Sequence, residues 1–277
     1  MRFRVRHVTT YTYSQPVRLG LHWLRLRPRY DGTVELLHFG LEIHPQPVGR
    51  SDSLDMEGNL ATCIWFAGEA IRLTVASRFE VRTLHADPYD YLPEPASWDA
   101  LHCPALQQRL APWIAQDEVA PPVLALARGL RHESQDAFEF VHLLTKQLHR
   151  QIQREIRDIG QAHAPEETLR RGRGACRDLT VLFVAACRSQ GLAARFVSGY
   201  QQGHGGQPRR YMHAWPEVYL PGGGWRGFDP THGLAVADQH VAVAAAARPE
   251  DATPVDGSFW GNAQSVLRAE VHIDVDE

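Results

Sequence analysis

Two stretches decide the fold: GACRDLTVLFVAACRSQGLAARFVSGY at residues 174–200, and HAWPEVYLPGGGWRGFDPT at residues 213–231. In the first stretch, a glycine-rich turn precedes an apolar run with helical spacing, and Gly191 stands where a C-terminal cap is expected. In the second stretch, two runs with strand character flank PGGG, which is typical of a hairpin. The two segments predict a cysteine-bearing helix packed on an antiparallel sheet.

Cys176 stands at the predicted start of the helix. Backbone N–H groups and the helix dipole favour a thiolate at this position, which is how a nucleophilic cysteine is commonly prepared. The N–H of Cys176 could donate to an oxyanion, and Gly172 and Gly174 would let the backbone approach a substrate closely. The alternative is a small buried cysteine with a packing role.

His213 and Asp229 lie on the two strands of the predicted hairpin. In one register Asp229 faces Trp215 and is diagonal to His213, and in the other it faces His213 directly. Both registers keep the two side chains on one face, roughly 5–8 Å apart at Cβ. A carboxylate there can accept the Nδ1–H of the imidazole, which predicts a Cys–His–Asp relay. A solvent-exposed His and Asp pair is the alternative.

Other residues near these segments have candidate roles as well. Trp215 would share the face of His213 and either wall the site from water or pack in the core, so it is a candidate substrate-binding residue together with Gly174. Asp178 is expected to cap the helix. Cys187, Cys63 and Cys103 are expected to be packing residues. Because no Cys-x-x-Cys pair occurs, neither a zinc ribbon nor a dense disulfide framework is expected. No metal or cofactor is predicted, and a two-histidine metal site is the weaker alternative.

The rest of the chain predicts an α+β protein in three parts. Residues 1–86 contain runs of alternating apolar and polar side chains separated by turns, which predicts an N-terminal antiparallel β-domain that is a sheet or sandwich-like. Residues 87–130 read as a proline-rich linker with short helices. The core is expected at residues 131–277, with a helix at 137–156 and a last strand at 267–275 that returns to a sheet.

Composition limits the function. The chain has 277 residues, of which 44% are hydrophobic and 22% charged, and a formal net charge of −3. These values exclude wholesale disorder and argue against a nucleic-acid partner bound through a basic surface. The basic N-terminus lacks a signal-peptide apolar stretch, and no spanning segment occurs, so a cytoplasmic location without a membrane partner is expected.

The segments GACRD, HAWPEV and FDPT resemble the core of the transglutaminase-like superfamily, and most closely its bacterial branch with an N-terminal β-domain. Sequences of that family have Gly-x-Cys-x-Asp at a helix start, followed by His-Ala-Trp-x-Glu-Val and then Phe-Asp-Pro-Thr. The opening HVTTYTYSQPV, the turn DMEGN and the tail HVAVAAAARPEDATPVDGSFWG are similar to the same branch. The resemblance covers most of the chain and implies a papain- or transglutaminase-like core.

The resemblance implies that Cys176 is the nucleophile, His213 the general base and acid, and Asp229 the orienting carboxylate. Three features depart from the family. No Asp-x-Asp-x-Asp-Gly loop occurs, so calcium is not implied. No tryptophan lies between Trp113 and Trp215, which leaves the second oxyanion donor unidentified. The tail has AAAARPED where the bacterial branch has a Gly-Arg-Asp-Tyr-like run.

Three functions stay open. The first is a cysteine-dependent enzyme acting on amide bonds of a peptide or protein through a thioester, with water or an amine as acceptor. A site without a recognisable amine pocket favours water and hence a protease or amidase. The second is arylamine N-acetyltransferase-like acyl transfer, because RGRGAC is similar to Arg-Gly-Gly-x-Cys. The third is a non-catalytic binding protein on the same fold. Specificity is expected from the glycine-rich loop at 201–210, and the oligomeric state is undetermined.

Overall fold

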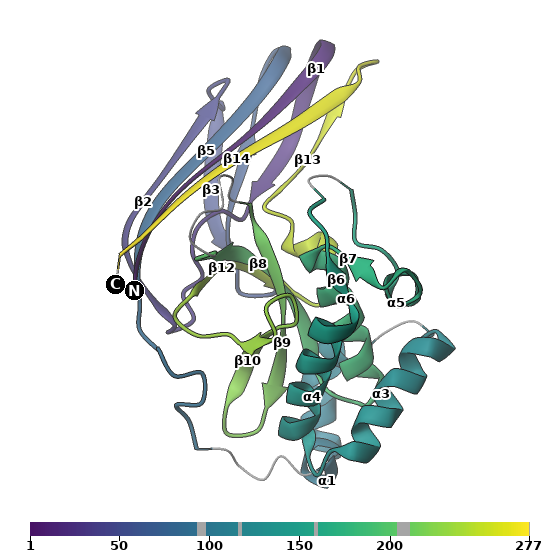
Figure 1. Ribbon diagram of the computed structural model, residues 1–277. Helices are drawn as coiled ribbons and strands as arrows, with labels where there is room; N and C mark the ends of the chain where they lie inside the picture. Colours follow the sequence, from purple (N-terminus) through teal and green to yellow (C-terminus); the bar gives the residue numbers. More distant parts are fainter. Residues whose placement is uncertain (93–97, 116–117, 158–159, 204–210, 277) are drawn as a thin grey trace.

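The computed structural model, which describes residues 1–92, 98–115, 118–157, 160–203 and 211–276, has a long N-terminal strand at the centre of its first sheet (Figure 1). β1 pairs antiparallel with β5 and β14 in its first half and with β4 and β13 near its end. The strands of this sheet are β1 (Arg2–Leu24), β2 (Val34–His44), β3 (Gly49–Leu54), β4 (Leu60–Trp65), β5 (Ala70–Thr83), β13 (Val255–Trp260) and β14 (Ser265–Asp276).

The alternation predicted for the N-terminal residues determines which face of β1 is buried. Phe3, Val5 and His7 point inward, whereas Arg4 and Arg6 between them are exposed. Successive side chains of a strand point to opposite faces, so one face of the sheet contacts the core and the other contacts water. The predicted N-terminal antiparallel β-domain is confirmed.

The last two strands of the chain belong to this first sheet. β14 pairs with residues 2–13 of β1, and both chain termini therefore lie at the same end of the sheet (Figure 1). The strand expected at 267–275 does return to a sheet, but that sheet is the N-terminal one. The segment predicted as the core therefore contributes its last two strands, β13 and β14, to the N-terminal sheet.

A second sheet carries the hairpin. Its strand order is β11-β10-β9-β8-β12, and the strands are β8 (Ala194–Gln201), β9 (His213–Leu220), β10 (Gly224–Asp229), β11 (Leu234–Ala235) and β12 (His240–Ala246). The helices α3 (Pro121–Glu133), α4 (Ala137–Gln151) and α6 (Cys176–Ser189) lie together on one side of it (Figure 1). Phe140, Leu144 and Phe183 are fully buried between these helices and the sheet. The α+β class and the packing of the cysteine-bearing helix on this sheet are confirmed.

The other elements are short. Between β5 and α3 lie α1 (Trp98–Leu101) and α2 (Pro104–Ile114); between α4 and α6 lie β6 (Gln153–Arg154), α5 (Pro165–Arg171) and β7 (Arg173–Gly174); and between β12 and β13 lies the 3-10 turn η1 (Pro249–Ala252). The proline-rich segment forms short helices as predicted, and Leu101 and Leu110 bury themselves against the core. The helix expected over 137–156 ends at Gln151, because the next residues pair as β6 with β7. Among the described residues, no helix is both long and apolar enough to span a bilayer.

The turn that contains DMEGN joins the two sheets. The side-chain amide of Asn59 donates to the carbonyl of Ala245 at 2.9 Å and accepts the N–H of Ala245 at 2.8 Å. Glu57 in the same turn accepts the N–H of Ala247 and the indole N–H of Trp113. Because Asn59 and Ala245 are fully buried, water cannot replace these bonds.

Replacing Asn59 with Ala should lower the free energy of unfolding by about 2–4 kcal/mol, since it leaves a buried N–H and C=O of Ala245 without partners. Urea unfolding followed by tryptophan fluorescence measures the change. Met56→Ala is the matched control, because Met56 is fully exposed in the same turn and its loss should change stability by less than about 0.5 kcal/mol. Equal effects of the two substitutions would contradict the role of Asn59.

Candidate active site

Cys176 is the first residue of α6 and follows β7 directly. β7 pairs with β6, which fixes the direction in which the chain enters the helix. The carboxylate of Asp178 accepts the backbone N–H of Ala175 at 2.8 Å and so holds the helix start. The thiol therefore lies at the positive end of the helix dipole, where a thiolate is stabilised.

Asp178 itself is fully buried, and its negative charge is balanced by hydrogen-bond donors. Both terminal nitrogens of the Arg157 guanidinium donate to it at 2.8 Å, and the N–H of His163 donates at 2.8 Å. Burial raises the pKa of this carboxyl, but the bonds from Arg157, His163 and Ala175 outweigh it and lower the pKa. Asp178 therefore caps the helix as expected, and Arg157 balances its charge so that it does not oppose a thiolate at Cys176.

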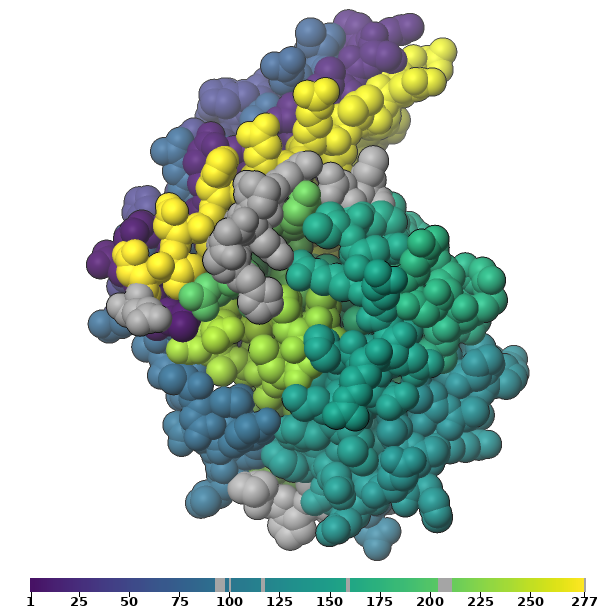
Figure 2. Space-filling model, viewed as in Figure 1, coloured from purple at the N-terminus to yellow at the C-terminus, as the bar shows by residue number. Residues whose placement is uncertain are grey.

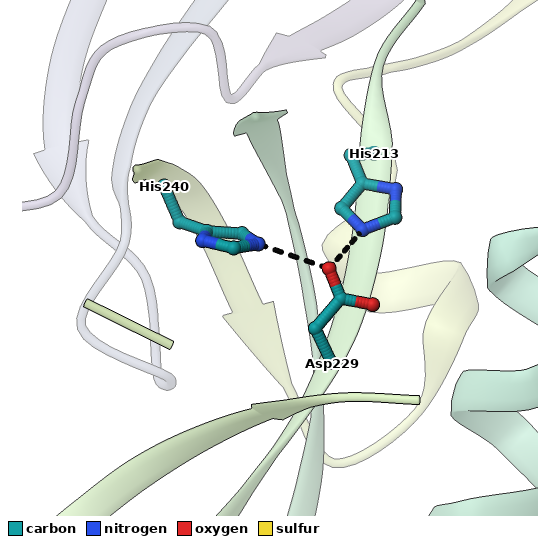
Figure 3. Close-up of side chains that lie close together, drawn as sticks. All are labelled: His213, Asp229 and His240. Atoms are coloured by element: carbon teal, nitrogen blue, oxygen red, sulfur yellow. Dashed lines mark hydrogen bonds and ion pairs between the residues drawn. The ribbon is translucent and has the colours of Figure 1, made fainter. Parts of the chain in front are cut away.

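His213 and Asp229 meet across the hairpin. Leu220 pairs with Gly224 and Glu217 with Gly227, which is the register that makes Asp229 a diagonal neighbour of His213. The two side chains point toward each other, with His213 Nε2 2.8 Å from Asp229 Oδ2 (Figure 3). The expected bond through Nδ1 is wrong, because the ring nitrogen of His213 that contacts Asp229 is Nε2.

Asp229 accepts hydrogen bonds from more than one histidine. His232 Nδ1 lies 2.7 Å and His240 Nε2 3.0 Å from the same carboxylate oxygen that contacts His213 (Figure 3 draws His240). The other oxygen accepts the backbone N–H groups of Thr231 at 2.9 Å and His232 at 3.2 Å. Burial raises the pKa of this carboxyl, yet the positive charge of His213 and these hydrogen bonds hold the pKa well below its usual range. Asp229 is thus an anchored, ionised carboxylate.

Cys176 and His213 line the same cavity. Burial raises the pKa of the Cys176 thiol, but the neighbouring imidazole and charge of His213 and the backbone N–H of Ala214 outweigh it and lower the pKa. For His213, burial lowers the pKa of the imidazole. The charge and the hydrogen bond of Asp229 outweigh burial and raise this pKa to about 10. Both directions favour a thiolate–imidazolium pair at neutral pH.

This pair opens onto a cavity of about 550 Å³ that both layers line. Cys176, His213 and His232 come from the core, while Tyr11 of β1 and residues 267–271 of β14 come from the first sheet. In Figure 2, β14 (yellow) runs above the teal and green part of the molecule that contains the core. The cavity volume is in the range of small-molecule and peptide sites.

The two residues expected to bind substrate lie behind the cavity. Trp215 is almost fully buried, and its ring stacks on that of His213 with centroids 6.0 Å apart. Gly174 is buried, and a Cβ there would come within 3.1 Å of Asp178 and 3.2 Å of Thr168. Trp215 thus supports the His213 ring, and Gly174 permits close packing of β7 on α6. Most of the glycine-rich loop at 201–210 lies outside the described residues, which include only its first three positions.

The sequence did not point to His232, His240 or Arg157 as part of the site. His232 lies three residues after Asp229 in the turn that follows β10, so a turn prediction could have placed it near the carboxylate. His240 starts β12, at the far edge of the sheet order, and no local pattern links it to Asp229. Arg157 likewise meets Asp178 only in the folded chain.

Two groups of described residues have the donor atoms that a metal ion would need: His213, Asp229 and His240, and separately Glu155, His163 and Asp178. In the first group, an ion would take up the ring nitrogen through which His213 contacts Asp229. In the second group, Arg157 contributes positive charge to both carboxylates, at 2.8 Å from Asp178 and 3.4 Å from Glu155. The closeness of the side chains in the first group follows from the hydrogen bonds of His213 and His240 to Asp229. In the second group it follows from the ion pairs of Arg157 with the two carboxylates.

Comparison with known proteins agrees with the geometry. Residues 124–230 match the transglutaminase-like superfamily, and residues 3–82 match the bacterial transglutaminase-like N-terminal region, which confirms the resemblance noted in the sequence. An uncharacterized protein of Mycobacterium tuberculosis is 27% identical over 290 residues, covering 99% of this chain and 92% of its own. One of Mycobacterium leprae is 26% identical over 294 residues, covering 98% of each chain.

A solved structure shows the same fold. The crystal structure of a "putative cysteine protease" from Cytophaga hutchinsonii matches with a TM-score of 0.75 and 20% identity, covering 100% of this chain and 92% of that one. At this identity the likeness concerns the fold of both layers. It confirms the predicted combination of an N-terminal antiparallel sheet with a cysteine-bearing core.

Cys176 should react with iodoacetamide at pH 7 as a thiolate, because its pKa is lowered and that of His213 is raised to about 10. The rate should fall only as the pH drops through the lowered thiol pKa. In His213→Ala the cation is gone and burial raises the thiol pKa, so the rate at pH 7 should fall at least about 10-fold and recover only at higher pH. Exposed Cys103, followed in the same protein by peptide mass spectrometry, is the internal control. A wild-type Cys176 that reacts no faster than Cys103 would contradict the ion pair.

Asp229→Asn keeps the shape of the carboxylate but removes its charge. The pKa of His213 should then fall from about 10, because burial lowers it and the opposing charge is absent. The imidazolium is lost at neutral pH, and the alkylation rate of Cys176 at pH 7 should fall about 10-fold or more. Histidine NMR titration and the pH profile of alkylation measure both effects. Glu250→Gln, which removes an exposed charge from η1, should leave both unchanged.

Proposed function

This chain belongs to the transglutaminase-like superfamily, and we propose that it is a cysteine-dependent enzyme that cleaves amide bonds through a thioester acyl-enzyme. The observation that carries the proposal is that Cys176 and His213 line one open cavity while His213 is hydrogen-bonded to the buried carboxylate of Asp229. The directions of the pKa shifts support a nucleophile and an acid that are already charged before substrate binds.

In the acylation step, the Cys176 thiolate adds to the carbonyl carbon of the amide and forms a C–S bond. The backbone N–H of Cys176 at the helix start is placed to donate to the oxyanion, because the first N–H groups of a helix have no partner within it. The His213 imidazolium gives its proton to the leaving nitrogen, and the C–N bond breaks. The products are a free amine, a thioester and a neutral imidazole held by Asp229.

In the deacylation step, neutral His213 takes a proton from the acceptor while the acceptor adds to the thioester carbon. The C–S bond then breaks, which releases the acyl product and restores the thiolate and the imidazolium. Water as acceptor gives a carboxylic acid, and an amine gives a new amide. The acylation chemistry is the same for both outcomes.

Hydrolysis is favoured by the setting of the thiol. The cavity beside Cys176 is wide and carries charged side chains such as Arg154, Glu155 and Glu270, which keep it hydrated. Water is then the acceptor at the highest concentration. A peptide or protein amide is accordingly the proposed substrate, and the name of the Cytophaga hutchinsonii protein is that of a protease as well.

Acetyl transfer to an arylamine and a purely binding function are the alternative proposals. The match to the transglutaminase-like superfamily favours the amide-cleaving proposal over acetyl transfer. The charged relay favours an enzyme over a scaffold, because a binding protein has no need of an activated thiol. A cytoplasmic location, and function without nucleic-acid, membrane or cofactor partners, stay predictions from the sequence.

Incubating the protein with a peptide library should release new amino termini or ammonia, read by mass spectrometry. Cys176→Ala should lower the rate at least about 1,000-fold, since the nucleophile is lost, whereas Cys103→Ala should leave it unchanged. Incorporation of a labelled alkylamine without release of acid would indicate transamidation instead. Acetylation of Cys176 by acetyl-coenzyme A would favour acetyl transfer, and a protein inert in all three assays would be a binding protein.

A further inference from the structure

The outer edge of β14 is a long strand edge to which the described part of the chain adds no further strand. Among the residues that the structure describes, β14 pairs only with β1. The pairing runs from Ser265 to Asp276 without a register shift, and the strand contains no proline or glycine. Native proteins usually protect such edges with a bulge, a proline or a short strand, because the free N–H and C=O groups bind other chains. This edge has none of these devices.

The same strand forms the wall of the cavity that holds the thiol. Five consecutive residues of β14, 267–271, line this cavity together with Cys176 and His213. Leu267 and Ala269 share the inner face with their partners Tyr11 and Thr9 on β1, which line the cavity as well. Leu267 is 39% exposed and Ala269 is exposed, so the inner face offers uncovered apolar surface next to the free edge.

We propose that β14 is the substrate-binding strand of the enzyme, and that it binds an extended peptide by adding it as a further strand to the first sheet. The inference rests on the proposed function, because the peptide carries the amide that Cys176 attacks. Residues 267–271 span about 13 Å, which suits a peptide segment of about five residues. Backbone pairing would supply affinity, and apolar side chains facing Leu267 and Ala269 would supply selectivity.

An extended backbone is the occupant that fits this surface. A row of alternating donors and acceptors is satisfied by another strand, whereas a compact amine or an acetyl thioester presents too few such groups. Residues 267–271 line the cavity that contains the nucleophile, so a strand added along them would bring its own amide bonds close to the thiol. Substrates should therefore be unfolded or looped segments of proteins.

Chloroacetyl peptides test the inference without a known substrate. The probe is chloroacetyl-Leu-Thr-Leu-Thr-Leu amide, which alkylates cysteine and extends along a strand with one apolar face. It should label Cys176 at least about 10-fold faster than chloroacetamide, because several backbone hydrogen bonds form. N-methylation of one peptide nitrogen at a time should remove this advantage at alternate positions only, since every second N–H points toward β14.

Two neighbouring residues of β14 provide matched variants. Leu267→Asn should lower the labelling rate by the peptide about 10-fold, because it removes an apolar contact on the inner face. Val266→Asn should not, since Val266 is 58% exposed on the opposite face of the same strand. The rate with chloroacetamide should be unchanged in both, which separates peptide binding from thiol reactivity.

Equal rates for the peptide and chloroacetamide, or N-methylation effects without alternation, would overturn the role of β14 while leaving the proposed function intact. If chloroacetamide labels Cys176 no faster than Cys103, the proposed function itself fails. A dimer detected by light scattering that Leu267→Asn dissociates, with peptide labelling unchanged, would assign the edge to a second copy of the chain and overturn the inference.

Discussion

The buried contact between His213 and Asp229 is the interaction on which the site depends. It joins the distal nitrogen of the imidazole to a carboxylate that two further histidines and two backbone N–H groups also hold. Burial alone would keep the imidazole neutral, and the anchored charge of Asp229 reverses that preference. The charged imidazole in turn outweighs the effect of burial on the Cys176 thiol. The anchored charge of Asp229 thus favours a charged imidazole, and the charged imidazole favours a thiolate at Cys176.

A second buried carboxylate positions the nucleophile. Asp178 holds the start of α6 through the N–H of Ala175, and Arg157 balances its charge. Both carboxylates are ionised and lie near the thiol, yet each has its own cation, so neither opposes the thiolate by an uncompensated charge. The start of α6 therefore positions Cys176 and the hairpin positions His213, and both side chains line one cavity.

The first sheet contributes to the site through the two ends of the chain. β14 pairs with residues 2–13 of β1, and the two strands form the wall of the cavity opposite the core. The two hydrogen bonds between the Asn59 side chain and the backbone of Ala245 in β12 hold the two sheets together. Without the N-terminal sheet, the core of this chain would therefore lack one wall of its cavity.

The sequence by itself determined the helix that begins at Cys176, the hairpin and the family, because caps, turns and periodicity are local properties. It left two hairpin registers open, and the pairing of Leu220 with Gly224 decided between them. Only the tertiary structure brought His240 to Asp229, joined Arg157 to Asp178 and returned β14 to β1. These contacts join residues far apart in the chain, and packing of the whole core selects them, so no local pattern could reveal them.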